Sequence, residues 1–151
     1  MLVPSSWIVL HDYVQSESAS SRNDYVSLEE FTNWAIMSGV PQDEVSRCID
    51  FLCNVGLIMH FDDAGKSDFG SDGSVRDLVI LHPQWLADVM ACMVTFRHRW
   101  VKHGLLRAGD VQCVFEAYPR EMHNKLLGLL QAFNIVYRLP PDGIHGDAVL
   151  V

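Results

Sequence analysis

Residues 51–59 (FLCNVGLIM) and residues 129–137 (LLQAFNIVY) decide the fold, because they carry the same pattern 78 residues apart. In each stretch an apolar helix end precedes Gly56 or Asn134, and an apolar extended run follows. Gly and Asn are the residues that most readily adopt the left-handed conformation that ends a helix. The sequence therefore predicts that one structural unit occurs twice in the chain.

The residues around the first stretch predict three helices and a β-hairpin. A first helix follows Pro4, and Ser27 with Glu30 forms a capping box that starts a second helix at Leu28. A third helix carries a core-facing stripe of Val45, Cys48, Ile49, Leu52 and Cys53. The apolar runs 57–61 and 77–81 flank a polar loop and are typical of two hairpin strands.

The remainder of the chain predicts a second unit after a long helix that opens at Pro83 and continues to about Trp100. The expected fold class is α+β and mostly helical, with two tandem winged-helix-like units, each a helix-turn-helix plus β-hairpin, joined by this helix. The expected domains are 1–82 (the first unit with its N-terminal helix), 83–103 (the bridging helix) and 104–151 (the second unit, truncated at its C-terminus). The expected structural anchors are Trp7, Trp34, Gly56, Pro83, Trp85 and Asn134.

Composition indicates a globular protein. The 151 residues are 49% hydrophobic and 20% charged, which excludes a disordered tail. No apolar run reaches the length of about 20 residues that a membrane helix needs, and no secretion signal opens the chain. We therefore expect a cytoplasmic protein without membrane insertion.

The sequence predicts no catalytic, cofactor or metal site. Gly65-Lys66-Ser67 resembles the end of a phosphate-binding loop, but His60 stands where the motif needs its first glycine. The aspartates of residues 62–77 do not follow calcium-loop spacing, so we expect a solvated acidic wing. The four cysteines lie singly in apolar stretches and are interpreted as reduced core thiols.

Nucleic-acid binding is the alternative that the predicted fold raises, because winged helices place a helix in the major groove and the wing on the backbone. The net charge of −8 and the acidic first wing argue against it, because both repel phosphate. We expect no nucleic-acid partner. A second alternative is a free-standing protein-interaction adaptor.

The chain resembles the COR domain (C-terminal of Roc) of ROCO proteins, the group that includes the leucine-rich repeat kinases. Residues 77–86 (DLVILHPQWL) resemble that family's VILDPQWL stretch, and residues 51–61 (FLCNVGLIMHF) resemble its FLHDLGxxLHF segment. Shorter matches are residues 3–7 (VPSSW), 27–31 (SLEEF), 103–106 (HGLL) and 126–133 (LLGLLQAF). The resemblance covers nearly the whole chain.

The resemblance implies a non-catalytic regulatory module that packs against the Roc GTPase domain in cis and relays its nucleotide state. It also implies contacts with the second COR half and a homodimer of the parent, a GTPase that in some relatives carries a kinase domain. His82 departs from the family, which often has Asp there. Residues 149–151 (VLV) match only the beginning of the family's LVPS segment, so we expect the N-terminal half of COR.

The basic run between the two predicted units is the expected protein interface. Four cations occur from position 97 to position 107, and the next acidic residue is Asp110. Such a patch suits an acidic partner surface, although a helix end that carries cations also satisfies the helix dipole. The expected interface residues are Arg97, Arg99, Trp100, Lys102 and Arg107.

Overall fold

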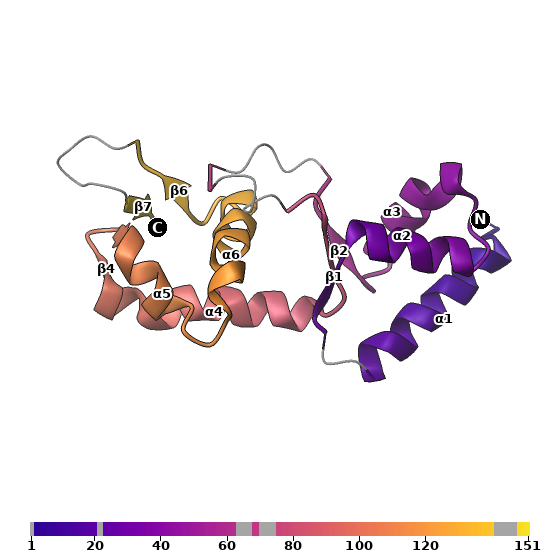
Figure 1. The fold of residues 1–151 in the computed structure, drawn as a ribbon, viewed down its shortest axis with the longest axis horizontal. Coiled ribbons are helices and arrows are strands. Elements are labelled where there is room, and N and C mark those ends of the chain that lie inside the picture. The colour runs from indigo at the N-terminus through magenta and orange to yellow at the C-terminus, as the bar shows by residue number, and fades with distance from the viewer. Residues whose placement is uncertain (1, 21–22, 63–67, 70–74, 141–147) are drawn as a thin grey trace. The chain divides into compact units, whose positions relative to one another are not determined.

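The computed structural model describes residues 2–20, 23–62, 68–69, 75–140 and 148–151, and all of their side chains except those of residues 94–98. Helices and two small antiparallel sheets make up the chain, which confirms the α+β class (Figure 1). The chain divides into two compact units: the first is Met1–Asp62 with Arg76–Leu86, and the second is Asp63–Val75 with Ala87–Val151. The predicted boundaries 1–82, 83–103 and 104–151 stay a prediction.

The first unit packs three helices on a small sheet. Its elements are α1 (Ser5–Ser20), β1 (Tyr25–Ser27), α2 (Leu28–Met37), the 3-10 helix η1 (Gln42–Glu44), α3 (Val45–Asn54), β2 (Met59–His60) and β3 (Leu78–Ile80). The strand order is β1-β3-β2, and Ile80 pairs with Tyr25 on one side and Met59 on the other. The predicted hairpin is therefore present, and β1 adds a third strand that the sequence did not predict.

Local signals in the sequence set the helix boundaries of the first unit. The Ser27 hydroxyl accepts a hydrogen bond from the Glu30 backbone N–H at 3.1 Å, so Ser27 is the N-cap of α2 as predicted. The stripe of α3 faces the core, where Cys48 and Leu52 are fully buried. Leu10 of α1 and Phe31 of α2 are buried in the same cluster.

The second unit contains most of α4 (Pro83–Trp100), which begins in the first unit. It continues with β4 (Val101–Lys102), β5 (Leu105–Arg107), the 3-10 helix η3 (Ala108–Asp110), α5 (Val111–Val114), α6 (Arg120–Ala132), β6 (Tyr137–Arg138) and β7 (Ala148–Leu150). The strand order is β4-β5-β7-β6. None of the helices in the described ranges is long and apolar enough to cross a bilayer.

The last helices of the two units end in the same way. Gly56 after α3 has φ +78°, and Asn134 after α6 has φ +57°. In each case the next residue donates a backbone hydrogen bond to a carbonyl five positions earlier, Leu57 to Leu52 at 3.0 Å and Ile135 to Leu130 at 2.9 Å. This is the hydrogen-bond pattern of a Schellman motif, so the two predicted helix ends share one backbone geometry.

The chain after Trp100 forms a hairpin, which the sequence did not predict. Val101 pairs with Leu106 and Lys102 with Leu105, and the two residues between the strands, His103 and Gly104, have φ of +53° and +78°. Two positive φ values in a two-residue loop are typical of a type I′ turn, whose twist matches that of the strands.

Residues 68–69 of the acidic segment between β2 and β3 are attached to the rest of the second unit, whereas most of the predicted solvated wing lies outside the described residues. The Asp68 N–H donates to the Gln131 side-chain oxygen at 3.1 Å, and the Gln131 amide donates to the Asp68 carboxylate at 2.6 Å. Arg138 donates to the Asp68 carbonyl at 2.6 Å, and the neighbouring Phe69 is buried. Contacts between residues so far apart in the chain leave no local pattern, so the sequence did not reveal this attachment.

The six predicted structural anchors occupy two kinds of position. Trp7 and Trp34 are half-buried against the core of the first unit, and Trp7 lies 5.4 Å from Phe51 between ring centroids. Trp85 is buried and lies 5.4 Å from the Tyr25 ring. The other three, Gly56, Pro83 and Asn134, are exposed residues at helix ends.

Candidate functional site

Two of the predicted interface residues lie together at the end of α4. Arg99 is exposed and Trp100 is half-buried, and the Arg99 guanidinium carbon lies 5.1 Å from the centroid of the indole ring. A guanidinium at this distance from an aromatic face makes a cation–π contact. The contact holds both side chains at the surface of the second unit.

The other predicted interface residues are placed differently. Lys102 pairs with Leu105 across the β4–β5 hairpin, and Arg107 follows Leu105 by two positions on the same strand. Because residues two apart on a strand share a face, these two exposed cations lie on one side of the second sheet. The side chain of Arg97 lies outside the described residues. The structure therefore brings Arg99 and Trp100 together, and it places Lys102 and Arg107 together on one face of the second sheet.

Arg99 and Trp100 line a pocket of about 400 Å³, which we call the Trp100 pocket. Its walls come from the end of α4, from α5, from the α5–α6 connection and from the start of α6. The remaining lining residues are Gln112, Cys113, Glu116, Tyr118, Arg120 and His123.

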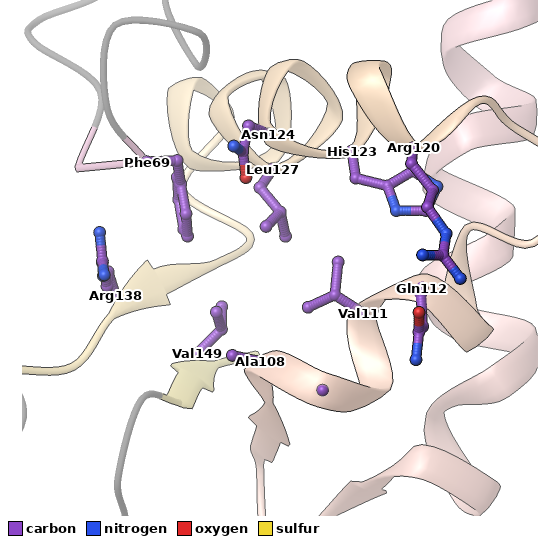
Figure 2. Close-up of a pocket in the computed structure, with 11 residues that line it drawn as sticks. Phe69, Ala108, Val111, Gln112, Arg120, His123, Asn124, Leu127, Arg138 and Val149 are labelled. Atoms are coloured by element: carbon purple, nitrogen blue, oxygen red, sulfur yellow. The ribbon is translucent and has the colours of Figure 1, made fainter.

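A second pocket, of about 480 Å³, adjoins the first, and we call it the Phe69 pocket. Figure 2 shows Val111 from α5, Leu127 from α6 and Val149 from β7 converging on its centre. The polar side chains stand around this apolar centre, with Arg138 on one side and Arg120 on the other (Figure 2). The complete lining is Phe69, Ala108, Gly109, Val111, Gln112, Arg120, His123, Asn124, Leu127, Arg138 and Val149.

Three residues, Gln112, Arg120 and His123, line both pockets and so connect them. We call the two adjoining pockets the basic groove. Its described lining includes three guanidinium groups, Arg99, Arg120 and Arg138, against a single carboxylate, Glu116. In a chain of net charge −8, this surface is an exception that favours an anionic partner.

His123 fixes the shape of the groove wall. Its Nε2 lies 3.0 Å from both the Phe115 and the Tyr118 carbonyl oxygens, so Nε2 carries the proton and donates to both. The ring is buried and lies 5.7 Å from the Phe115 ring. A buried imidazole that bridges two carbonyls orders the α5–α6 connection, which in turn places Arg120 at the start of α6.

Sequence reasoning missed Arg120, Gln112 and His123 as parts of a site. Arg120 is separated from the basic run by η3 and α5, and only the packing of α5 against α6 brings it near Arg99. Pro119, which has an extended conformation before α6, is the one sequence signal that places Arg120 at a helix start.

The cysteines of the chain are thiols rather than disulfides. All four cysteines are free thiols, and burial raises the pKa of Cys48 to about 11 and also raises the pKa of Cys53. The thiols of Cys48 and Cys53, whose pKa values are raised, are protonated at neutral pH and are poor nucleophiles. Within the described ranges, no three His, Cys, Asp or Glu residues gather where they could hold a metal ion.

The chain thus combines an α+β fold with a basic groove on its second unit. The family model for the C-terminal of Roc, COR-A domain matches residues 4–151. The chain therefore belongs to the COR-A family, the N-terminal half of the COR domain of ROCO proteins.

Known relatives are much longer than this chain. The probable serine/threonine-protein kinase qkgA of Dictyostelium discoideum is 35% identical over 122 residues, which are 80% of this chain and 7% of that protein. The Roc-COR-CHAT protease of Runella zeae is 23% identical over 134 residues, 89% of this chain and 13% of that protein.

A solved structure with the same fold is that of Methanosarcina barkeri Roco2 RocCORdC bound to GDP. The TM-score is 0.73 at 20% sequence identity, and the alignment covers 98% of this chain and 43% of the Roco2 chain. At this identity the likeness describes the fold alone.

Proposed function

We propose that this COR-A domain is a non-catalytic regulatory module that packs against the Roc GTPase domain of its own protein and relays the nucleotide state of Roc to the rest of the chain. The observation that carries the proposal is the COR-A family match, which spans residues 4–151. The Roc-COR-CHAT protease and Roco2 RocCORdC support it, because the names of both proteins join Roc to COR.

The relay requires an interface that differs between the GDP and GTP states of Roc, because a contact made equally in both states transmits nothing. We place this interface on the end of α4 and the β4–β5 hairpin, with Arg97, Arg99, Trp100, Lys102 and Arg107 as its residues. Exposed cations and a half-buried indole suit a surface that docks and separates. The second COR half, and a homodimer of the parent protein, are further proposed partners.

Calorimetric titration tests the relay directly. This chain is titrated with the Roc domain of the same protein, loaded first with GDP and then with a non-hydrolysable GTP analogue. We expect affinities that differ at least fivefold, and the ratio gives the coupling free energy. Equal affinities would make the domain a passive scaffold and overturn the relay.

A charge-reversal pair tests where the interface lies. Arg99→Glu with Lys102→Glu is expected to weaken binding to Roc by tenfold or more, because it places two carboxylates in a cationic surface. Arg47→Glu, a reversal of an exposed arginine on α3 of the first unit, is the matched control and is expected to leave the affinity unchanged. Unchanged binding of the Arg99–Lys102 variant would remove the interface from this surface.

We also infer that both units are winged-helix-like. In the first unit a strand, two helices and a hairpin follow one another, and the strand order β1-β3-β2 places the first strand beside the last. In the second unit β5, β7 and β6 are arranged in the same way. This architecture supports nucleic-acid binding as the alternative function.

The alternative predicts tight, steeply salt-dependent binding to duplex DNA. On α3, which follows the helix-helix turn of the first unit, the negative charge of exposed Asp50 balances the positive charge of exposed Arg47. We therefore expect no change in the fluorescence anisotropy of a labelled duplex at about 50 mM salt, where counterion release favours binding most. A salt-dependent rise in anisotropy would favour the alternative over the relay.

A further inference from the structure

The Phe69 pocket has an apolar floor. Val111, Leu127 and Val149 are no more than 8% exposed, and in Figure 2 their side chains point toward a common space. Phe69 closes one side of this space. Its volume of about 480 Å³ lies in the range of pockets that bury a small ligand or a few side chains. The floor therefore suits an apolar side chain.

The rim of the Phe69 pocket is cationic at two separate places. Figure 2 shows Arg138 and Arg120 on opposite sides of the apolar floor. Arg138 is held in place because it donates to the Asp68 carbonyl at 2.6 Å. The Gln112 and Asn124 amides are also part of the lining, and none of the described lining residues carries a carboxylate. This absence is notable in a chain with 19 acidic and 11 basic residues.

The pocket is part of an elongated groove rather than an isolated cavity. Through Gln112, Arg120 and His123 it adjoins the Trp100 pocket, which adds about 400 Å³ and a third guanidinium. Two adjoining pockets that combine apolar and cationic side chains match an extended peptide segment better than a compact small molecule.

We infer that the Phe69 pocket binds a short segment of a partner protein in which one apolar side chain is flanked by two carboxylates. The apolar side chain lies on Val111, Leu127 and Val149, and the carboxylates meet the guanidinium groups of Arg120 and Arg138. Guanidinium groups bind carboxylates through two parallel hydrogen bonds, which favours acidic residues over neutral ones. The inference goes beyond the proposed function, because it holds whichever protein supplies the segment.

Three labelled peptides test the chemistry of the ligand by fluorescence anisotropy. Their central sequences are Asp-Ser-Leu-Ser-Glu, its neutral counterpart Asn-Ser-Leu-Ser-Gln, and Asp-Ser-Ser-Ser-Glu, which lacks the apolar side chain. We expect the first peptide to bind at least tenfold more tightly than either of the others, and its affinity to fall as salt rises. Equal binding of all three, or no binding of the first, overturns the inference.

Two variants of the chain test the place of binding. Arg120→Gln removes one rim charge at an exposed position, and Ala108→Trp fills the pocket from an exposed lining position. Both variants are expected to bind the Asp-Ser-Leu-Ser-Glu peptide at least tenfold more weakly than the parent chain does. The controls are Arg47→Gln and Ala132→Trp, which change exposed residues outside both pockets and are expected to bind as the parent does.

Ala108→Trp separates filling of the pocket from loss of charge, because it leaves every charge in place. If both pocket variants bound the peptide normally while remaining folded by circular dichroism, the pocket would not be the site. The outcome is separable from that of the Roc titration, which measures nucleotide dependence with an intact partner domain and uses no peptide.

Discussion

The two units end their last helix with the same backbone geometry but present different surfaces. In the first unit Leu52 is buried in the core near this helix end and Leu57 packs against the core, and exposed apolar side chains such as Val9 and Met37 remain on its helices. In the second unit the equivalent helix, α6, contributes Arg120 and Leu127 to the basic groove. A shared helix-end geometry therefore does not imply a shared surface, because the residues that end the helices are not those that form the groove.

Substitutions of Leu52 and Leu130, which occupy equivalent positions at the two helix ends, are expected to have the largest effect. Leu52 and Leu130 both have 0% exposure and both accept the hydrogen bond that closes their helix. Leu52→Ala and Leu130→Ala are each expected to cost about 3 kcal/mol in the free energy of unfolding, because each leaves a cavity in a packed core. Urea denaturation followed by circular dichroism measures the loss, with the exposed Val55→Ala as control. A cost below about 1 kcal/mol at one position would show that the two cores are not equivalent.

The helix-ending residues give the next largest effect. Gly56→Ala is expected to cost about 1–2 kcal/mol, because an alanine must adopt φ +78°. A Cβ atom at Gly56 would meet nothing within 4 Å, so strain of the backbone is the only cost. Asn134→Gly should change the free energy of unfolding by less than about 0.5 kcal/mol, because glycine adopts φ +57° without strain. Thermal unfolding of both variants measures this difference, and equal losses in the free energy of unfolding would contradict the expectation.

The N-cap of α2 gives the third largest expected effect. The Ser27 hydroxyl caps α2, so Ser27→Ala is expected to cost about 1 kcal/mol in the free energy of unfolding. Ser27→Asp retains a capping oxygen and serves as the control in the same urea titration. A loss as large for Ser27→Asp as for Ser27→Ala would assign the effect to something other than the cap.

Arg107 offers the smallest and sharpest comparison. It precedes η3 with φ −73° and ψ 144°, close to the φ −69° and ψ 153° of Ser27, but it makes no side-chain capping bond. Arg107→Ser should therefore stabilise the second unit by about 0.5 kcal/mol. The midpoint of thermal unfolding measures the gain, and Arg107→Ala, which cannot cap, should not show it. A destabilised serine variant would mean that the two turns differ more than their dihedral angles suggest.

The parts of the fold that follow from nearest neighbours could be predicted from the sequence. Ser27 and Gly56 act through bonds to residues within a few positions, so their roles are visible in the chain. The strand β1 has three residues, too few for a periodic pattern, and it becomes a strand only by pairing with β3. The attachment of Asp68 to Gln131 depends on tertiary packing and has no local signal.

The candidate site could be predicted only in part, for the same reason. The cationic run points to Arg99 and Trp100, which do line the groove. Arg120 comes from a different helix and joins them through the packing of α5 and α6, so spacing along the chain could not reveal it. The sequence places the run next to a helix end, although its last residues form a hairpin whose turn, His103-Gly104, has two positive φ values.

The position of Trp100 has a spectroscopic consequence. The chain has four tryptophans, and Trp100 is the only one in residues 87–151. Its indole is half-buried in the groove and lies against the Arg99 guanidinium. A chain in which Trp7, Trp34 and Trp85 are replaced by Phe would emit from this residue alone. The wavelength of its emission would then shift when the groove fills, which gives the second unit an intrinsic optical reporter of its own occupancy.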